Sequence, residues 1–432
     1  MPFTDLGVRA AAAAVTSGEV TATALVEACL ARVRAVDATV QAWIYVDEAA
    51  ALASARAADA ARRGAATGPL HGVPVGIKDI VDVAGMPTTA GARAFAHGKP
   101  ARDAAAVARL RAAGAIVLGK THTTQFAFRD PAPTRNPWNP AHTPGGSSSG
   151  SAAAVAARMV PCAIGSQTVG SILRPAAYCG VVGVKGTHGL VPTDGVVPLA
   201  WSLDHIGPFA RSVDDAALVL GVLAGRPLAA DGSQAPRLAL PRELFDRAEP
   251  ELRRHLDGVV ERLRGAGARV EEVSLPASFA QLAAAGQVVL EVEAAAYHEA
   301  AFARHGADYG RGIAEMIAIG LKRPGTEYVG ANRRRLQFRD DVTPLLAAHD
   351  ALLSPTAPAP APEGLAWTGD ASLCQPWSSA GVPSLSLPTG LSAAGLPLAL
   401  QLVAAPSAET RLLTAAAWCE RTVGWTAAPP VA

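Results

Sequence analysis

Segments with helical spacing alternate with short apolar runs along this chain, and this alternation limits its fold more than any other feature of the sequence. Residues 103–113 have helical spacing and lead into the apolar run 115–118. The predicted strands are 73–77, 80–83, 115–118, 237–240, 269–273, the first part of 351–364, 383–388 and 396–403. Alternation of this kind is typical of a layered α/β sheet, and we therefore predict the α/β class.

The chain offers no clear domain boundary. Its length of 432 residues alone would suggest two or three domains, but no linker or repeat separates them. Residues 1–65 are predicted to be helical, with Thr21 or Thr23 able to cap one of the helices. The long loop 130–150 leads directly into a predicted helix at 151–158, which favours a functional loop over disorder.

The charge balance gives no sign of a highly charged partner. Lys and Arg number 38 against 37 Asp and Glu, for a net charge of +1, so bulk charge would not steer the protein to nucleic acid or to an anionic membrane. We therefore expect a small-molecule amide as partner, no nucleic acid and no membrane. The five cysteines are scattered without metal-ligand spacing, and no leader or long apolar stretch is present, which predicts a cytoplasmic protein.

Three stretches rich in Gly and Ser contain the residues that could carry chemistry. They are GVPVGIKDIVDVAG at 72–85, PGGSSSGSAAAVAA at 144–157 and GSQTVGSILRPAAYCG at 165–180. Lys78 lies among apolar residues in the first, and burial there would lower its pKa and leave an amine that can act as a general base. Its local sequence is explained more simply by a surface lysine that extends its ammonium into water.

Serines of the other two stretches are candidate nucleophiles. Ser171 follows a glycine in a turn whose backbone N–H groups could converge on an oxyanion. Ser147 follows Gly145-Gly146, which frees the backbone for an unusual conformation. Ser148 fits the G-x-S-x-G elbow of α/β-hydrolases, but that motif needs a strand before it, and the residues before it here are loop-like.

Together, these stretches resemble the amidase-signature family. The runs TPGGSSSGSAAAVAA and RPAAYCGVVGVKGTHGLVP are very similar to the family pattern, and GVPSLSLPTG with GLPLALQLV resembles its closing strands. The resemblance implies a single α/β domain over 1–432, with a central mixed sheet covered by helices on both faces. Its parts would be the N-terminal helices (1–65), the catalytic signature region (69–212), a mostly helical substrate-pocket region (213–345), and the closing strands with a terminal helix (346–432).

The resemblance also implies the roles of individual residues. Ser171 would be the acylated nucleophile, Ser147 a bridging serine that follows a cis peptide bond, and Lys78 the base. The oxyanion hole would consist of the backbone amides of Thr168, Val169, Gly170 and Ser171. The family implies neither a metal nor an organic cofactor.

Two positions depart from the usual family pattern. Val169 stands where the family usually has Gly, and Gln167 stands where it usually has Asp. Gln167, and an arginine three residues after the nucleophile, are similar to malonamidase-like members. There the arginine binds the free carboxylate of the substrate, which would give Arg174 the same role. Alternatively, Arg174 pairs with a protein carboxylate such as Asp194 or Asp204.

The leading hypothesis is a hydrolase that cleaves a small carboxamide to a carboxylate and ammonia or an amine. A second is the amidase subunit of a tRNA-dependent amidotransferase, which makes ammonia from glutamine for a partner. The others are an esterase or carbamate hydrolase on the same fold, an esterase that uses Ser148, and a silent scaffold for which Val169 is the only sign. A homodimer through the N-terminal helices is compatible with the sequence.

Overall fold

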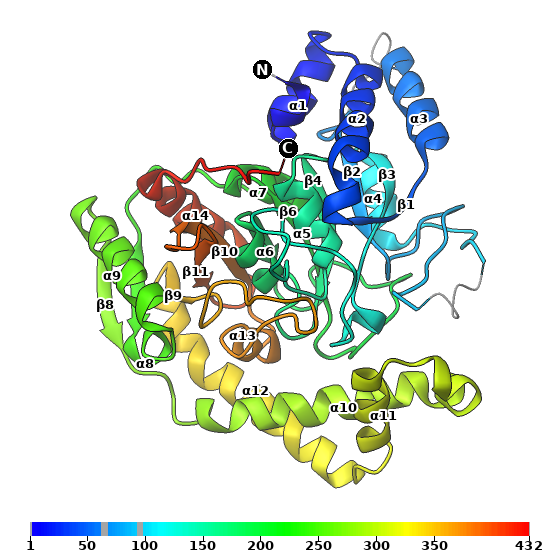
Figure 1. Ribbon diagram of the computed structural model, residues 1–432. Coiled ribbons are helices and arrows are strands. Elements are labelled where there is room, and N and C mark those ends of the chain that lie inside the picture. The colour runs from blue at the N-terminus through cyan, green and yellow to red at the C-terminus, as the bar shows by residue number, and fades with distance from the viewer. Residues whose placement is uncertain (1, 62–67, 93–97, 432) are drawn as a thin grey trace.

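A long mixed sheet runs through the protein, seen here in a computed structural model that describes residues 2–61, 68–92 and 98–431 (Figure 1). Within these residues eleven strands form one sheet in the order β1-β3-β2-β4-β6-β5-β10-β11-β9-β7-β8. The strands are β1 (Trp43–Val46), β2 (Pro74–Lys78), β3 (Ile116–Thr121), β4 (Cys162–Gln167), β5 (Val182–Lys185), β6 (His205–Ala210), β7 (Arg237–Pro241), β8 (Arg269–Val273), β9 (Ala351–Pro355), β10 (Ser384–Leu391) and β11 (Pro397–Val403). Strand β2 is parallel to β3 and β4, and β7 is parallel to β8 and β9, whereas the other neighbours are antiparallel. The predicted α/β class with a mixed sheet is confirmed.

Helices surround this sheet. They are α1 (Val8–Ser17), α2 (Ala22–Val40), α3 (Glu48–Ala61), α4 (Ala105–Ala112), α5 (Ser149–Ala156), α6 (Leu173–Cys179), α7 (Val213–Ala224), α8 (Arg242–Phe245), α9 (Pro250–Gly265), α10 (Phe279–His305), α11 (Arg311–Gly320), α12 (Gly325–Ala347), α13 (Gln375–Ser379) and α14 (Glu409–Val423). Short 3₁₀ turns lie at Phe3–Asp5, Gln125–Ala127 and Gly306–Asp308. Helices α1 to α3 lie together beside β1, β2 and β3, and α10, α11 and α12 form a separate layer (Figure 1).

Local details agree with the predictions in most places. Thr21 caps α2, since its side chain accepts a hydrogen bond from the backbone N–H of Ala24. Residues 62–65 of the predicted N-terminal helices lie outside the described residues. The strand predicted at 80–83 is wrong: the chain turns after Lys78, whose carbonyl accepts from the N–H of Val81, so these apolar residues pack in a turn.

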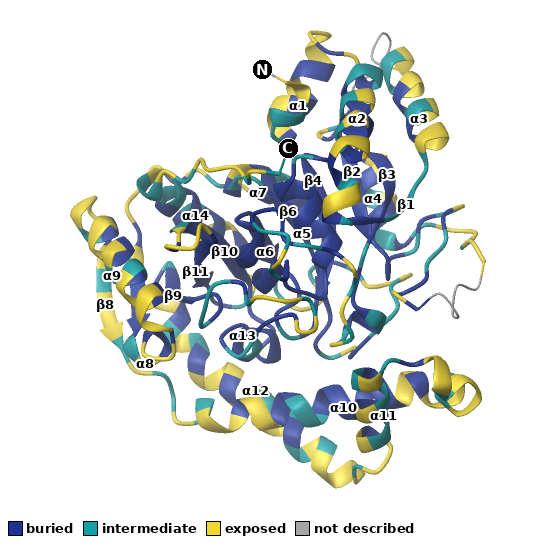
Figure 2. Cartoon of the chain, in the orientation of Figure 1, coloured by how far each residue is buried: buried dark blue, intermediate teal, exposed yellow. Residues whose placement is uncertain are grey.

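The core consists mainly of small side chains that allow close backbone approach, and it forms the continuous buried interior in Figure 2. Gly207 in β6 is an example. A Cβ atom at this position would lie 1.9 Å from the carbonyl oxygen of Val184 in β5, closer than any real contact. Close packing between these two strands therefore depends on the absence of a side chain.

Gly207→Ala is expected to lower the free energy of unfolding by about 1–3 kcal/mol, the usual cost of forcing a group into a packed interior. Urea unfolding would measure it. The matched control is Gly258→Ala in the exposed face of α9, where an added Cβ meets nothing within 4 Å. That change should stabilise the helix by about 0.5–1 kcal/mol. Equal effects of the two substitutions would contradict this account.

Candidate active site

Lys78 lies at the end of β2 with no exposed surface. Its Nζ donates to Ser147 Oγ at 2.7 Å and to Ser166 Oγ at 2.8 Å. Burial lowers the pKa of Lys78 well below its usual value, and the negative charge of Asp204 opposes this shift. The alternative of a surface lysine is therefore wrong, because β2 is covered on both sides. An uncharged amine at this distance has a lone pair that can accept the hydroxyl proton of Ser147.

Ser147 is also fully buried, and the peptide bond between Gly146 and Ser147 is cis, as the resemblance implies. Gly145 before it has φ +82°, and a Cβ there would lie 2.8 Å from the backbone of Pro175 in α6. Helix α5 begins two residues after Ser147. The glycine pair thus lets the loop turn sharply between two helices and directs Ser147 toward Lys78.

The segment 168–171 connects β4 to α6 and is held at its start by Gln167. The Oε1 atom of Gln167 accepts from the backbone N–H groups of Ile172 at 2.8 Å and Leu173 at 2.9 Å, and its Nε2 donates to Ser378 Oγ at 2.9 Å. A carboxylate could accept the same two N–H bonds but could not donate to Ser378. The glutamine therefore joins the start of α6 to α13.

Val169 fits this loop without backbone strain. It is not among the described non-glycine residues with positive φ, and its carbonyl accepts from Ser378 Oγ at 2.7 Å. Thr168 Oγ1 donates to Asp204 Oδ1 at 2.6 Å on the other side of the loop. Since the backbone at Val169 needs no left-handed conformation, the valine does not argue for a silent scaffold.

The two serine loops are adjacent. The backbone N–H of Ser148 donates to the carbonyl of Ser171 at 3.3 Å, which joins the residue after Ser147 to the predicted nucleophile. Ser148 itself has no exposed surface, and its Oγ bonds to both the N–H and the carbonyl of Ser166. Its hydroxyl is therefore a link between α5 and β4 and is not available to a substrate.

A cavity of about 350 Å³ opens above Ser171. It is lined by Ala127, Phe128, Arg129, Thr168, Val169, Gly170, Ser171, Arg174, Leu199, Gln287, Leu290, Trp367, Thr368, Gly369, Asp370, Ala371, Ser372 and Gln375. The whole segment predicted to form the oxyanion hole is thus part of its wall. Gln287 and Leu290 come from α10, so the helical region after residue 213 contributes to the pocket.

Arg174 lines the same cavity but is almost fully buried. Its guanidinium donates to the carbonyl of Gly146, at 2.6 Å, and to the carbonyl of Gly369. Its Nε has no hydrogen-bond partner among the described residues. No ion pair in the described part of the chain involves Arg174, so the expected pairing with Asp194 or Asp204 is not found. Arg174 instead connects the cis peptide to the loop that closes the pocket.

Several functional contacts were not predicted from the sequence. Ser166 is a second hydrogen-bond partner of Lys78, and Asp204 is both the acceptor for Thr168 and the carboxylate that acts on the pKa of Lys78. The described residues contain no group of three or more His, Cys, Asp or Glu side chains placed to hold a metal ion. Ser166 could have been suspected, because it lies in the same Gly/Ser-rich stretch as Ser171.

Comparison with known proteins decides the family. The family model described as Amidase matches residues 24–413. The chain belongs to the amidase family. The solved structure of an amidase aligns with a TM-score of 0.90 and 35% identity, over 96% of this chain and 99% of that one. The peptide amidase from Stenotrophomonas maltophilia aligns with a TM-score of 0.86 and 33% identity, over 100% and 99% of the two chains.

Curated relatives of this amidase have a more specific name. One of the subunits of glutamyl-tRNA(Gln) amidotransferase from Chloroflexus aurantiacus is 36% identical over 97% of both chains. The corresponding protein from Anaeromyxobacter sp. (strain K) is 38% identical over 98% of both chains. This finding overturns the expectation of a small-molecule partner with no nucleic acid. Net charge reports bulk attraction only, and it cannot show that a protein works within a tRNA-dependent assembly.

The amidase contains no membrane-crossing segment that could be recognised: in the part of the chain that the structure describes, every helix is too short or too polar to span a bilayer. All five cysteines are free and buried.

Proposed function

We propose that this amidase releases ammonia from the side-chain amide of glutamine, as the amide-hydrolysing component of a tRNA-dependent amidotransferase. Relatives named as parts of such an enzyme match the chain at 36–38% identity over nearly the whole length of both partners. The observation that carries amide hydrolysis is the 2.7 Å contact between Lys78 Nζ and Ser147 Oγ, two groups without exposed surface beside the loop of Ser171.

The reaction proceeds as a proton relay followed by an acyl transfer. Uncharged Lys78 takes a proton from Ser147, whose oxygen takes one from Ser171 as the Ser171 oxygen attacks the amide carbon. The backbone amides of 168–171 stabilise the negative charge that develops on the carbonyl oxygen. The C–N bond then breaks, the relay returns a proton to the nitrogen, and ammonia leaves. Water repeats the sequence on the ester at Ser171 and releases the carboxylate.

Two opposite charges in the pocket support glutamine as the substrate. Arg129 and Asp370 both line the cavity above Ser171 and are partly exposed there. A guanidinium is well shaped for the α-carboxylate of an amino acid, and a carboxylate suits its α-ammonium. The pair therefore fits a zwitterion whose side chain reaches down to Ser171.

Asp370→Asn is expected to raise KM for glutamine about tenfold or more, because one charge-assisted contact to the α-ammonium is lost. Asparagine keeps the oxygen that accepts from the N–H of Ser372 at 2.6 Å, so the loop should stay in place. Glutaramic acid, which lacks the α-amino group, should lose almost nothing. Ammonia release at varied substrate concentrations measures both.

The matched control for that substitution is Asp340→Asn on α12, an exposed carboxylate that does not line the cavity. It should leave both substrates unaffected. An equal loss on glutamine and glutaramic acid in Asp370→Asn would mean that Asp370 does not bind the α-ammonium.

A second candidate function is supported by Arg174. It lies three residues after Ser171, as in malonamidase-like members, and its Nε faces no hydrogen-bond partner among the described residues. A free carboxylate of the substrate could accept from that N–H, in which case the chain acts alone on small or peptide amides, like the peptide amidase it is similar to. Turnover of malonamic acid or a peptide amide with no turnover of glutamine would favour this candidate.

A further inference from the structure

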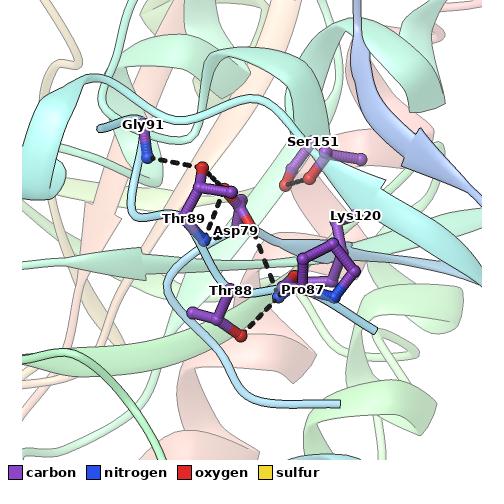
Figure 3. Close-up of polar contacts among 8 residues, drawn as sticks. Asp79, Pro87, Thr88, Thr89, Gly91, Lys120 and Ser151 are labelled. Atoms are coloured by element: carbon purple, nitrogen blue, oxygen red, sulfur yellow. Dashed lines mark hydrogen bonds and ion pairs between the residues drawn. The ribbon is translucent and has the colours of Figure 1, made fainter. Parts of the chain in front are cut away.

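A second buried lysine lies next to the proposed triad (Figure 3). Lys120 in β3 and Asp79, the residue after Lys78, both have side chains with no exposed surface, and Lys120 Nζ lies 3.2 Å from Asp79 Oδ1. Ion pairs buried to this extent are rare, because both charges must leave water. The proposed mechanism does not use this pair.

A short loop completes the surroundings of both charges. Lys120 Nζ donates to the carbonyl of Pro87 at 3.1 Å and to Thr88 Oγ1 at 2.9 Å, which together with Asp79 accounts for its three protons. The Asp79 carboxylate accepts from the N–H of Thr89 and from its hydroxyl. Figure 3 shows these contacts converging from the loop onto the pair. The carboxylate is therefore held in one orientation.

The strand register places this pair and Lys78 on opposite sides of the sheet. In the parallel pairing of β2 with β3, Ile77 is opposite Lys120 and Lys78 is opposite Thr121. Side chains alternate between the two faces of a strand, so Lys78 shares its face with Thr121. Thr121 Oγ1 is 2.7 Å from Ser151 Oγ in α5, the helix that follows Ser147, which confirms that this is the face of the site.

We propose that Lys120 is a positioning residue for amide hydrolysis: it holds and neutralises the Asp79 carboxylate on the far face of the sheet and so allows the adjacent Lys78 to work as an uncharged base. This inference rests on the proposed function. Without Lys120, a buried carboxylate would have no countercharge, and the nearest amine that could supply one would be that of Lys78.

The other charges near the two lysines do not change this argument. Asp204 faces Lys78 and Asp82 acts on Lys120, and both carboxylates favour the charged form of the lysine that they face. Adding the unpaired charge of Asp79 would raise the pKa of Lys78 further. A protonated Lys78 cannot accept the proton of Ser147, so activity would require a higher pH.

The test is the pH dependence of kcat/KM for ammonia release from glutamine by the full-length protein. Lys120→Met is expected to move the acidic limb of the profile upward by about one pH unit, the shift that one carboxylate at partly screened, buried distance produces. The double variant Asp79→Asn with Lys120→Met removes both charges and should return the limb to its wild-type position. Lys120→Gln, which keeps an N–H donor toward the 87–88 loop, should show the same upward shift as Lys120→Met if the latter does not fold.

Lys185→Met serves as the matched control. Lys185 is another fully buried lysine in the same sheet, but its Nζ donates to the carbonyl of Val382 and it pairs with no carboxylate among the described residues. Its removal should leave the limb in place whatever it does to stability. An unshifted limb in both Lys120 variants, or a shift that persists in the double variant, would overturn the inference. If instead the wild-type protein hydrolyses no amide at any pH, it is the proposed function that fails.

Discussion

Replacing Ser171 with alanine is expected to reduce kcat for ammonia release by at least about 10³-fold, the largest effect of any single substitution in this protein. The reason is that no other hydroxyl can form the acyl-enzyme: Ser147 and Ser148 have no exposed surface, whereas Ser171 lies in the wall of the cavity. The residual rate would come from the pocket and its backbone amides, as in serine hydrolases that lack their nucleophile.

The control for this experiment is Ser148→Ala. Its hydroxyl links α5 to β4 through Ser166, so its loss should cost about 1 kcal/mol of stability and leave kcat within a few-fold of wild type. Trapping the acyl-enzyme with hydroxylamine should label wild type and Ser148→Ala but not Ser171→Ala. Activity that survives in Ser171→Ala but not in Ser148→Ala would instead make Ser148 the nucleophile, as in an α/β-hydrolase elbow.

Strands with continuous apolar or β-branched residues were predicted well. The run 269–273 matches β8 at both ends, and 237–240 differs from β7 by one residue. Strands β4, β5 and β6 were missed, although they form the centre of the sheet. Their sequences, CAIGSQ, VGVK and HIGPFA, contain glycine, proline and polar residues, and a strand buried on both faces shows no alternation that could reveal it.

The site was predictable as far as local motifs extend. The three Gly/Ser-rich stretches indicated Lys78, Ser147 and Ser171, and the resemblance implied the cis bond before Ser147. Contacts between distant segments could not be predicted in the same way. Local sequence favoured a surface position for Lys78, because what buries it is its place in the sheet between β3 and β4. The pairing of Asp79 with Lys120 depends likewise on the register of β2 against β3, which no local pattern specifies.

Lys78→Met should lower kcat/KM by about 10³-fold, since the relay loses its base, and it should also change how stability depends on pH. Burial lowers the pKa of Lys78 in the folded protein, whereas the unfolded chain keeps a value near 10.5. Between those two values the unfolded state binds one more proton than the folded state, so the free energy of unfolding rises with pH in that window.

The destabilising contribution of Lys78 is therefore fully present below its folded pKa and disappears as the pH approaches 10.5. Methionine has no such contribution. Part of its gain at neutral pH is offset by the lost hydrogen bonds to Ser147 and Ser166, worth about 1–3 kcal/mol, so the pH trend is more informative than any single value.

Denaturant unfolding of both proteins from about pH 6 to 10 should show the stability difference, Lys78→Met minus wild type, decreasing steadily as the pH rises. Lys185→Met offers a comparison within the same sheet, because burial lowers the pKa of Lys185 to about 7 and predicts a trend of the same sign without a loss of the base. A stability difference for Lys78→Met that does not change with pH would mean that Lys78 is charged in the folded protein. The relay through Ser147 would then have no base, since a protonated amine has no lone pair to accept the proton.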